Sequence, residues 1–146
     1  MEVEPELIEQ YIRPGRAALV YRHLAQLGES SLVTAEASEC AADQDRFWEM
    51  RDIIYRNQSA MLRSGDVRGF VSTAAAQLGL DQPAFELCMD THTHHAFIEA
   101  DYEDARNSGV RSRPVFDIVG PGEGQRLVGA LPFAQFEEAL NAALAE

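Results

Sequence analysis

The sequence predicts an α/β fold in which a helical insertion interrupts a small sheet-containing part. Three observations lead to this prediction. Apolar runs of strand length occur near residue 20 and after residue 114, helical patterns fill the region between them, and an amphipathic pattern closes the chain. Residues 1–30 and 109–146 are expected to form the sheet-containing part, and residues 31–108 the helical insertion. At 146 residues the chain is long enough to make one compact unit overall.

The first 21 residues are typical of a short helix followed by a strand. A helix is expected from Pro5 to about Ile12, because proline is well accommodated in a first helical turn. Pro14 and Gly15 then end the helical pattern. The run Ala17–Tyr21 is apolar and of strand length, so we expect a buried strand there.

Between Ser31 and Gly109 the apolar residues recur with helical spacing, and about five short helices are expected. Side-chain oxygens that can accept a backbone N–H predict where these helices begin. The expected N-cap residues are Ser30 or Ser31, Asp43, Asp66 and Asp81. The last helix of the insertion is expected over 96–107, with a stop near Gly109.

After Gly109 the hydrophobic period changes from that of a helix to that of a strand. Residues 115–119 and 125–129 are expected to pair as a hairpin across the glycine-rich turn 120–124. That turn superficially resembles a phosphate-binding loop, but no lysine and no helix follow it. A final amphipathic helix is expected to begin at Pro132, and no cofactor is indicated.

Charge and hydropathy exclude two classes of partner. The chain has 24 acidic and 12 basic residues and a net charge of −12, so a nucleic-acid backbone would be repelled. No run of about 18 apolar residues predicts a membrane span. The start at Met1–Glu4 lacks the basic and apolar parts of a secretory signal, so a cytoplasmic location is expected for the chain as written.

The cysteines and histidines give weak indications of chemistry. Cys40 and Cys88 have neither Cys-X-X-Cys nor metal-ligand spacing, so we interpret them as small buried hydrophobic residues without a disulfide. On a helix, His92, His95 and Glu99 would share one face and could bind a divalent metal. A solvated helix start explains them more simply, and no metal is expected. His23 is interpreted as a packing or surface residue.

Five segments and the order of the expected elements carry a family resemblance: Val20–Leu24, Ala37–Ala41, Phe47–Met50, Gly109–Phe116 and Leu127–Phe133. They resemble the DsbA-like branch of the thioredoxin fold, a family of thiol-disulfide oxidoreductases with a helical insertion. Together they extend over nearly the whole chain. The resemblance implies a thioredoxin-like fold with an inserted helical domain.

The resemblance also implies a peptide-docking loop at Arg113 and Pro114. Pro114 would be the cis-proline of the fold, and the backbone before it would pair with an extended protein or peptide substrate. A cis bond is energetically accessible before proline, where it costs only about 0.5–1 kcal/mol. The family usually has threonine or valine where this chain has Arg113.

The first strand of the family and its Cys-X-X-Cys have no counterpart in this sequence. Disulfide exchange needs an activated thiolate and a resolving thiol one turn away, and no catalytic residue is therefore carried over. The missing strand would lie between the strand near Val20 and the strand near Phe116. Its absence leaves three outcomes open: a start upstream of Met1, which we favour, closure of the two remaining strands, or a second copy that completes the sheet as a homodimer.

Three functions follow from these observations. The first is a DsbA-like family protein that is redox-inactive as written because the Cys-X-X-Cys is missing. The second is a non-catalytic module that binds peptides or proteins through the loop at Pro114. The third follows glutathione-transferase relatives with the same insertion, but the serine or cysteine that would activate glutathione is also missing.

Overall fold

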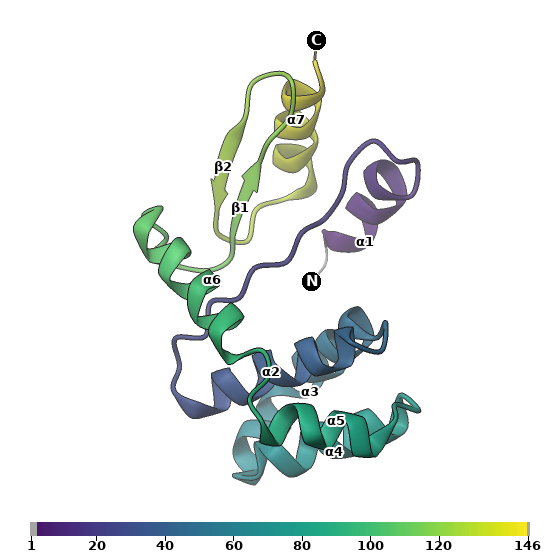
Figure 1. Cartoon of the computed structure of the whole chain (residues 1–146). Coiled ribbons are helices and arrows are strands. Elements are labelled where there is room, and N and C mark those ends of the chain that lie inside the picture. The colour runs from purple at the N-terminus through teal and green to yellow at the C-terminus, as the bar shows by residue number, and fades with distance from the viewer. Residues whose placement is uncertain (1–2, 146) are drawn as a thin grey trace. The chain divides into compact units, whose positions relative to one another are not determined.

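The computed structural model describes residues 3–145, which form a mixed α/β arrangement (Figure 1). The elements are α1 (Glu4–Leu7), the π-helical turn η1 (Ile8–Ile12), α2 (Glu29–Ala42), α3 (Phe47–Ser64), α4 (Val67–Gln77), α5 (Gln82–Asp90), α6 (His95–Asn107), β1 (Val115–Ile118), β2 (Gln125–Val128) and α7 (Phe133–Leu144). None of the described helices is both long and apolar enough to cross a bilayer.

The chain divides into two compact units. The sheet unit contains the described residues up to Tyr21 and from Arg106 onward, and the helical unit contains residues 22–105. The helical unit therefore begins earlier than the insertion expected over 31–108. The reason is a local one, since Arg22 and His23 are bound to Asp101 of α6 and so belong to the helical unit.

Two of the four expected helix starts are confirmed. The carboxylates of Asp66 and Asp81 accept hydrogen bonds from Gly69 N, at 2.8 Å, and Ala84 N, at 3.0 Å. The other two are wrong. The N-cap of α2 is Gly28, with φ 78°, and Asp43 follows the end of α2 as its C-cap. Side-chain capping is only one way to satisfy the first N–H groups of a helix, which solvent also satisfies.

The core of the helical unit is formed by the faces that α2, α3, α4 and α5 turn toward one another. Helix α2 contacts α3, α4 and α5, and α4 contacts α3 and α5. The largest fully buried side chains of this core are Phe85, Met50, Val71 and Cys40. Burial of these large apolar groups is the main stabilising contribution in this unit.

The sheet unit is built on an antiparallel hairpin, as expected. Phe116 of β1 pairs with Leu127 of β2, and both strands contact α7. The ring of Phe116 lies edge to face against Phe136 of α7, with 4.8 Å between centroids. Tyr11 of η1 donates from its hydroxyl to Asn141 of α7 at 3.2 Å, so the first helical turns are tied to the last helix.

The glycine-rich turn packs against the end of α7 and leaves no room for a Cβ at Gly120 or Gly122. A Cβ on Gly120 would lie 2.2 Å from the carbonyl oxygen of Ala143. The N–H of Gly122 donates to the same oxygen at 2.9 Å. Gly120 and Gly122 are therefore explained by close packing on a helix C-terminus, where unpaired carbonyls need donors.

The strand predicted at Ala17–Tyr21 is wrong, because the structure has no strand there. The described sheet contains β1 and β2 alone. A strand exists only where a neighbour accepts and donates its backbone hydrogen bonds, and composition does not supply that neighbour. The alternative in which residues 17–21 and β1 pair directly as neighbouring strands of one sheet is therefore wrong as well.

A cross-strand ion pair on the hairpin predicts a pH-dependent stability. Arg126 donates to both carboxylate oxygens of Asp117, at 2.6 and 2.8 Å, and these hydrogen bonds hold the pKa of Asp117 below its ordinary value. A carboxyl group with a lowered pKa stabilises the fold above its unfolded pKa, and this contribution is lost as the pH falls through the folded pKa. Because both side chains of this pair are partly exposed to solvent, we expect the pair to contribute about 0.3–1 kcal/mol to the free energy of unfolding.

Thermal unfolding between pH 7 and pH 3 tests this expectation. The wild-type chain should lose more stability than Asp117→Asn as the pH falls below about 4. Glu137→Gln, an exposed acid without an ion pair among the described residues, is the control and should follow the wild type. Equal pH profiles for Asp117→Asn and the wild type would contradict the assignment.

Candidate functional site: the proline loop and the edge of β1

The peptide bond between Arg113 and Pro114 is cis, as predicted. Both residues are exposed and directly precede β1. The carbonyl of Pro114 accepts a hydrogen bond from Gly129 N at 2.8 Å, which extends the hairpin by one pair. Within residues 3–145, the backbone N–H and C=O of Arg113 have no hydrogen-bond partner.

One edge of β1 is open in the described sheet. In an antiparallel ladder, successive residues direct their N–H and C=O groups to opposite edges. Pro114 bonds toward β2, so Phe116 and Ile118 do the same, and Val115 and Asp117 direct their backbone groups to the other edge. These two residues, together with Arg113, present a row of donors and acceptors to an incoming chain.

The loop before β1 is locally basic in an acidic chain. Arg106, Arg111 and Arg113 lie within eight positions of one another, whereas the whole chain has a net charge of −12. Arg111 donates to the carbonyls of Arg106 and Val110. Arg113 is exposed and forms no ion pair within the part of the chain that the structure describes. The loop therefore offers a cation beside the open edge of β1.

A group of side chains with potential chemical roles lies in the helical unit, where Cys40 and Cys88 form a disulfide. The interpretation of these cysteines as unconnected buried residues is wrong. Packing of α2 against α5 brings their Cα atoms to 5.9 Å, within the range that a disulfide needs. The cysteines are 48 positions apart in the sequence, so nothing in their spacing reveals the contact.

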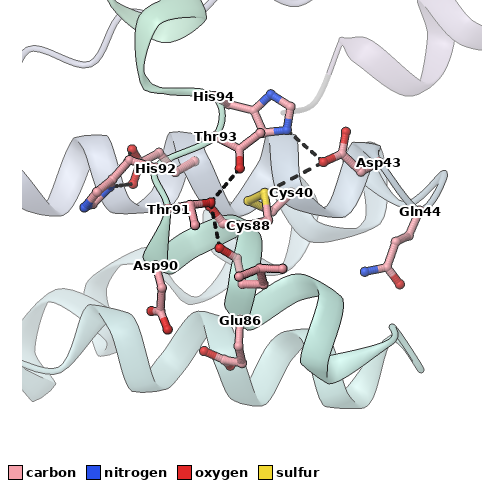
Figure 2. The surroundings of a disulfide bond; sticks show 12 residues. Cys40, Asp43, Gln44, Glu86, Cys88, Asp90, Thr91, His92, Thr93 and His94 are labelled. Carbon is pink, nitrogen blue, oxygen red and sulfur yellow. Dashed lines mark hydrogen bonds and ion pairs between the residues drawn. A yellow bond between two sulfur atoms is a disulfide. The ribbon is translucent and has the colours of Figure 1, made fainter.

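Asp43 and His94 lie beside this disulfide (Figure 2). Nε2 of His94 is 2.9 Å from a carboxylate oxygen of Asp43, and the same oxygen is 3.7 Å from Sγ of Cys88. A bonded sulfur has no proton to donate, so the second distance is a contact. Sequence reasoning missed this cluster because its members come from separate helices and turns.

Two of the three weak metal candidates, His92 and His95, come together, but beside Glu36 and not beside Glu99. His92 lies in the turn before α6, with φ 50°, and only His95 and Glu99 belong to that helix. Nδ1 of His92 and of His95 lie 3.0 and 3.4 Å from Oε1 of Glu36, a buried residue of α2. Glu99 is exposed. The carboxylate that these histidines meet is therefore one that the sequence pattern did not indicate.

His23 is buried and has charged partners. Its Nε2 lies 2.6 Å from Oε1 of Glu39, and its backbone N–H donates to Asp101 at 2.9 Å. Arg22 donates to the other oxygen of Asp101 at 2.5 Å. Asp101 thereby fixes the entry of the chain into the helical unit, and the expectation that His23 has a packing role agrees with its burial.

Comparisons with known proteins identify the family. The family model described as thioredoxin matches residues 1–142. Three curated relatives are named as Na(+)/H(+) antiporters: NhaA of Herminiimonas arsenicoxydans is 34% identical over 111 residues, NhaA 1 of Salinispora arenicola is 31% identical over 121 residues, and NhaA 3 of Salinispora tropica is 30% identical over 121 residues.

The matched regions include 76% of this chain for the first relative and 82% for the other two, but only 16%, 18% and 18% of the relatives themselves. The chain thus spans less than a fifth of the length of the relatives that it matches. No solved structure gives a significant match. Since the thioredoxin model extends over nearly all of the sequence, the chain belongs to the thioredoxin family.

Proposed function

We propose that this chain is a DsbA-like thioredoxin-fold domain that binds an extended peptide or protein segment at the edge of β1, without disulfide exchange of its own. The observation that carries the proposal is the open edge of β1 in the described sheet, where the backbone groups of Arg113, directly before Pro114, have no partner within residues 3–145. Addition of a strand to an open sheet edge is a recurring way to bind an extended chain, and its affinity comes from main-chain hydrogen bonds.

The charge near the loop favours an acidic segment as the occupant. The exposed guanidinium of Arg113 stands where the family usually has an uncharged residue. A carboxylate on the bound segment would pair with this guanidinium. The acidic surface elsewhere on the chain would repel the same segment, so the segment would bind at the loop and not elsewhere. We therefore expect peptides with one or two acidic residues to bind more tightly than basic peptides of equal length.

The two cysteines do not support a thiol-based reaction. Cys40 and Cys88 are bonded to each other and are only 1% and 8% exposed. Neither lies at the start of a helix, where the positive end of the dipole lowers a thiol pKa. We expect no acceleration of insulin reduction by a dithiol, and peptide binding that is unchanged in Cys40→Ala/Cys88→Ala. An acceleration that this double variant abolishes would contradict the proposal.

Titration of the ¹⁵N-labelled chain with an unstructured, cysteine-free acidic peptide tests the binding site. The amide signals of Arg113, Val115 and Asp117 should shift together. Val115→Pro removes a backbone N–H from the open edge of β1 without removing a hydrogen bond to β2, so binding should weaken at least about tenfold.

The matched control is Val128→Pro, which removes the corresponding N–H from the outer edge of β2. This variant should bind the peptide like the wild type. Both variants are first checked for the hairpin signals of the folded chain. Binding that survives Val115→Pro, or that is lost equally in Val128→Pro, would overturn the placement of the site.

We also propose that the domain works as an extramembrane part or partner of a cation/proton antiporter. The support is that each relative named above is called an antiporter, whereas no described helix of this chain could span a bilayer. A purified antiporter from the same cell should bind the wild-type chain in detergent, and Val115→Pro should abolish that binding. Equal binding of both chains would contradict a role for β1 in this contact.

A further inference from the structure

Three potential metal donors, and a carboxylate beside two of them, come together in the helical unit from three places in the sequence. Cys40 is near the end of α2, Asp43 directly follows that helix, Cys88 is on α5, and His94 precedes α6. One donor atom each of Cys40, Cys88 and His94 lies within 4.8 Å of the other two. We propose that these residues bind Zn²⁺ when the disulfide is reduced, with Asp43 as the fourth ligand.

The distances suit a tetrahedral zinc site after a small movement. With Zn–S near 2.3 Å and Zn–N near 2.0 Å, neighbouring ligand atoms lie about 3.5–3.8 Å apart. The carboxylate oxygen of Asp43 is already 3.7 Å from Sγ of Cys88 and 2.9 Å from Nε2 of His94. Once the bond between the sulfurs is broken, they need to separate by about 1.7 Å, which side-chain rotation can supply.

The donor set favours zinc over other common divalent ions. Two thiolates and an imidazole are ligands that Zn²⁺ prefers, whereas Mg²⁺ and Ca²⁺ prefer oxygen ligands. The sulfurs are buried, but the side chains of His94 and Asp43 are 21% and 51% exposed. The ion can therefore enter from solvent on the side of these two residues, which Figure 2 shows next to the disulfide.

Reduction and metal binding are coupled in this site. A dithiol reductant transfers two electrons and two protons to the disulfide, which yields two cysteine thiols and the oxidised cyclic disulfide of the reductant. Binding of Zn²⁺ then releases the two thiol protons and leaves two thiolates on the metal. Reformation of the disulfide removes both sulfur ligands, so oxidation releases the ion.

The neighbouring group of Glu36, His92 and His95 provides an internal comparison. It has two imidazoles and a buried carboxylate, but no sulfur. His92 and His94 are two positions apart in the same turn, and only His94 lies beside the disulfide. Replacement of either by asparagine therefore separates the proposed site from a general effect of histidine loss.

The experiment measures Zn²⁺ affinity of the full chain by competition with a chromophoric chelator, in the disulfide form and after reduction with a phosphine. The reduced wild type is expected to bind one Zn²⁺ with a dissociation constant below about 100 nM, and the disulfide form at least a hundredfold more weakly. His94→Asn should weaken binding to the reduced chain at least about tenfold, and His92→Asn should leave it unchanged. Co²⁺ should give a thiolate charge-transfer band and the visible bands of a tetrahedral ion.

If reduction unfolds the chain, thermal unfolding with and without zinc still tests the proposal. Zinc should then raise the thermal midpoint of the reduced wild type and of His92→Asn by more than that of His94→Asn. Equal affinities of His94→Asn and the wild type would overturn the proposal, and so would equal affinities of the reduced and disulfide forms. The outcome is independent of the proposed peptide binding, because the donors and the β1 edge lie in different units.

Discussion

Replacement of both Cys40 and Cys88 by alanine is expected to lower the free energy of unfolding of the helical unit by about 4 kcal/mol. The disulfide joins residues 48 positions apart, and this covalent closure removes much of the conformational freedom of the unfolded chain. It also links α2 to α5 across the core of the unit. Urea unfolding followed by far-ultraviolet circular dichroism measures the effect, because nearly all of this signal comes from helices.

The reduced wild-type chain in the presence of a metal chelator is the control for this double variant. It should unfold at a similarly low urea concentration, since it lacks the same covalent link but keeps both side chains. The chelator excludes stabilisation by zinc at the site proposed above. A double variant within about 1 kcal/mol of the oxidised wild type would show that the link contributes little, and would contradict the chain-entropy argument.

Asp101→Ala is expected to destabilise the helical unit by about 2–3 kcal/mol. The side chain of Asp101 is almost completely buried and accepts hydrogen bonds from Arg22 and from the backbone N–H of His23. Its removal leaves a buried N–H without a partner and an arginine without its counter-ion. The same urea unfolding measures the loss, and the amide signal of His23 should show increased hydrogen exchange.

Asp104→Ala on the same helix is the matched control. Asp104 is exposed, so its replacement should change the free energy of unfolding by no more than about 0.5 kcal/mol. Asp101→Asn should fall between the two, because an amide oxygen can still accept the N–H of His23 but cannot neutralise Arg22. Similar losses for Asp101→Ala and Asp104→Ala would mean that the hydrogen bonds of Asp101 do not fix the start of the helical unit.

The elements that the sequence predicted correctly depend on neighbours in the chain. The hairpin of β1 and β2 follows from two alternating runs beside a glycine-rich turn, and its register is a local property. The start of α4 at Asp66 and that of α5 at Asp81 follow from side chains that reach an N–H three positions away. The cis bond at Pro114 follows from the resemblance of residues 109–116 to a known loop.

The expectations that failed depend on partners distant in the sequence. The run Ala17–Tyr21 has the composition of a strand, but no described strand lies beside it to complete its hydrogen bonds. Glu36 was not indicated as the partner of His92 and His95, because it is 56 positions away from the first of them. The same reason explains why Asp43 was taken for a helix start rather than a neighbour of His94.

The sequence alone determined the helical character of the region before β1, the hairpin, the closing helix and the residues of the loop before β1, since each is encoded within a few successive positions. Only the tertiary structure decided that Cys40 meets Cys88, that Asp101 holds Arg22 and His23, and that one edge of β1 is open within residues 3–145. These contacts arise from the way helices and strands pack, and a pattern of residue types does not specify which faces of two separate elements will touch.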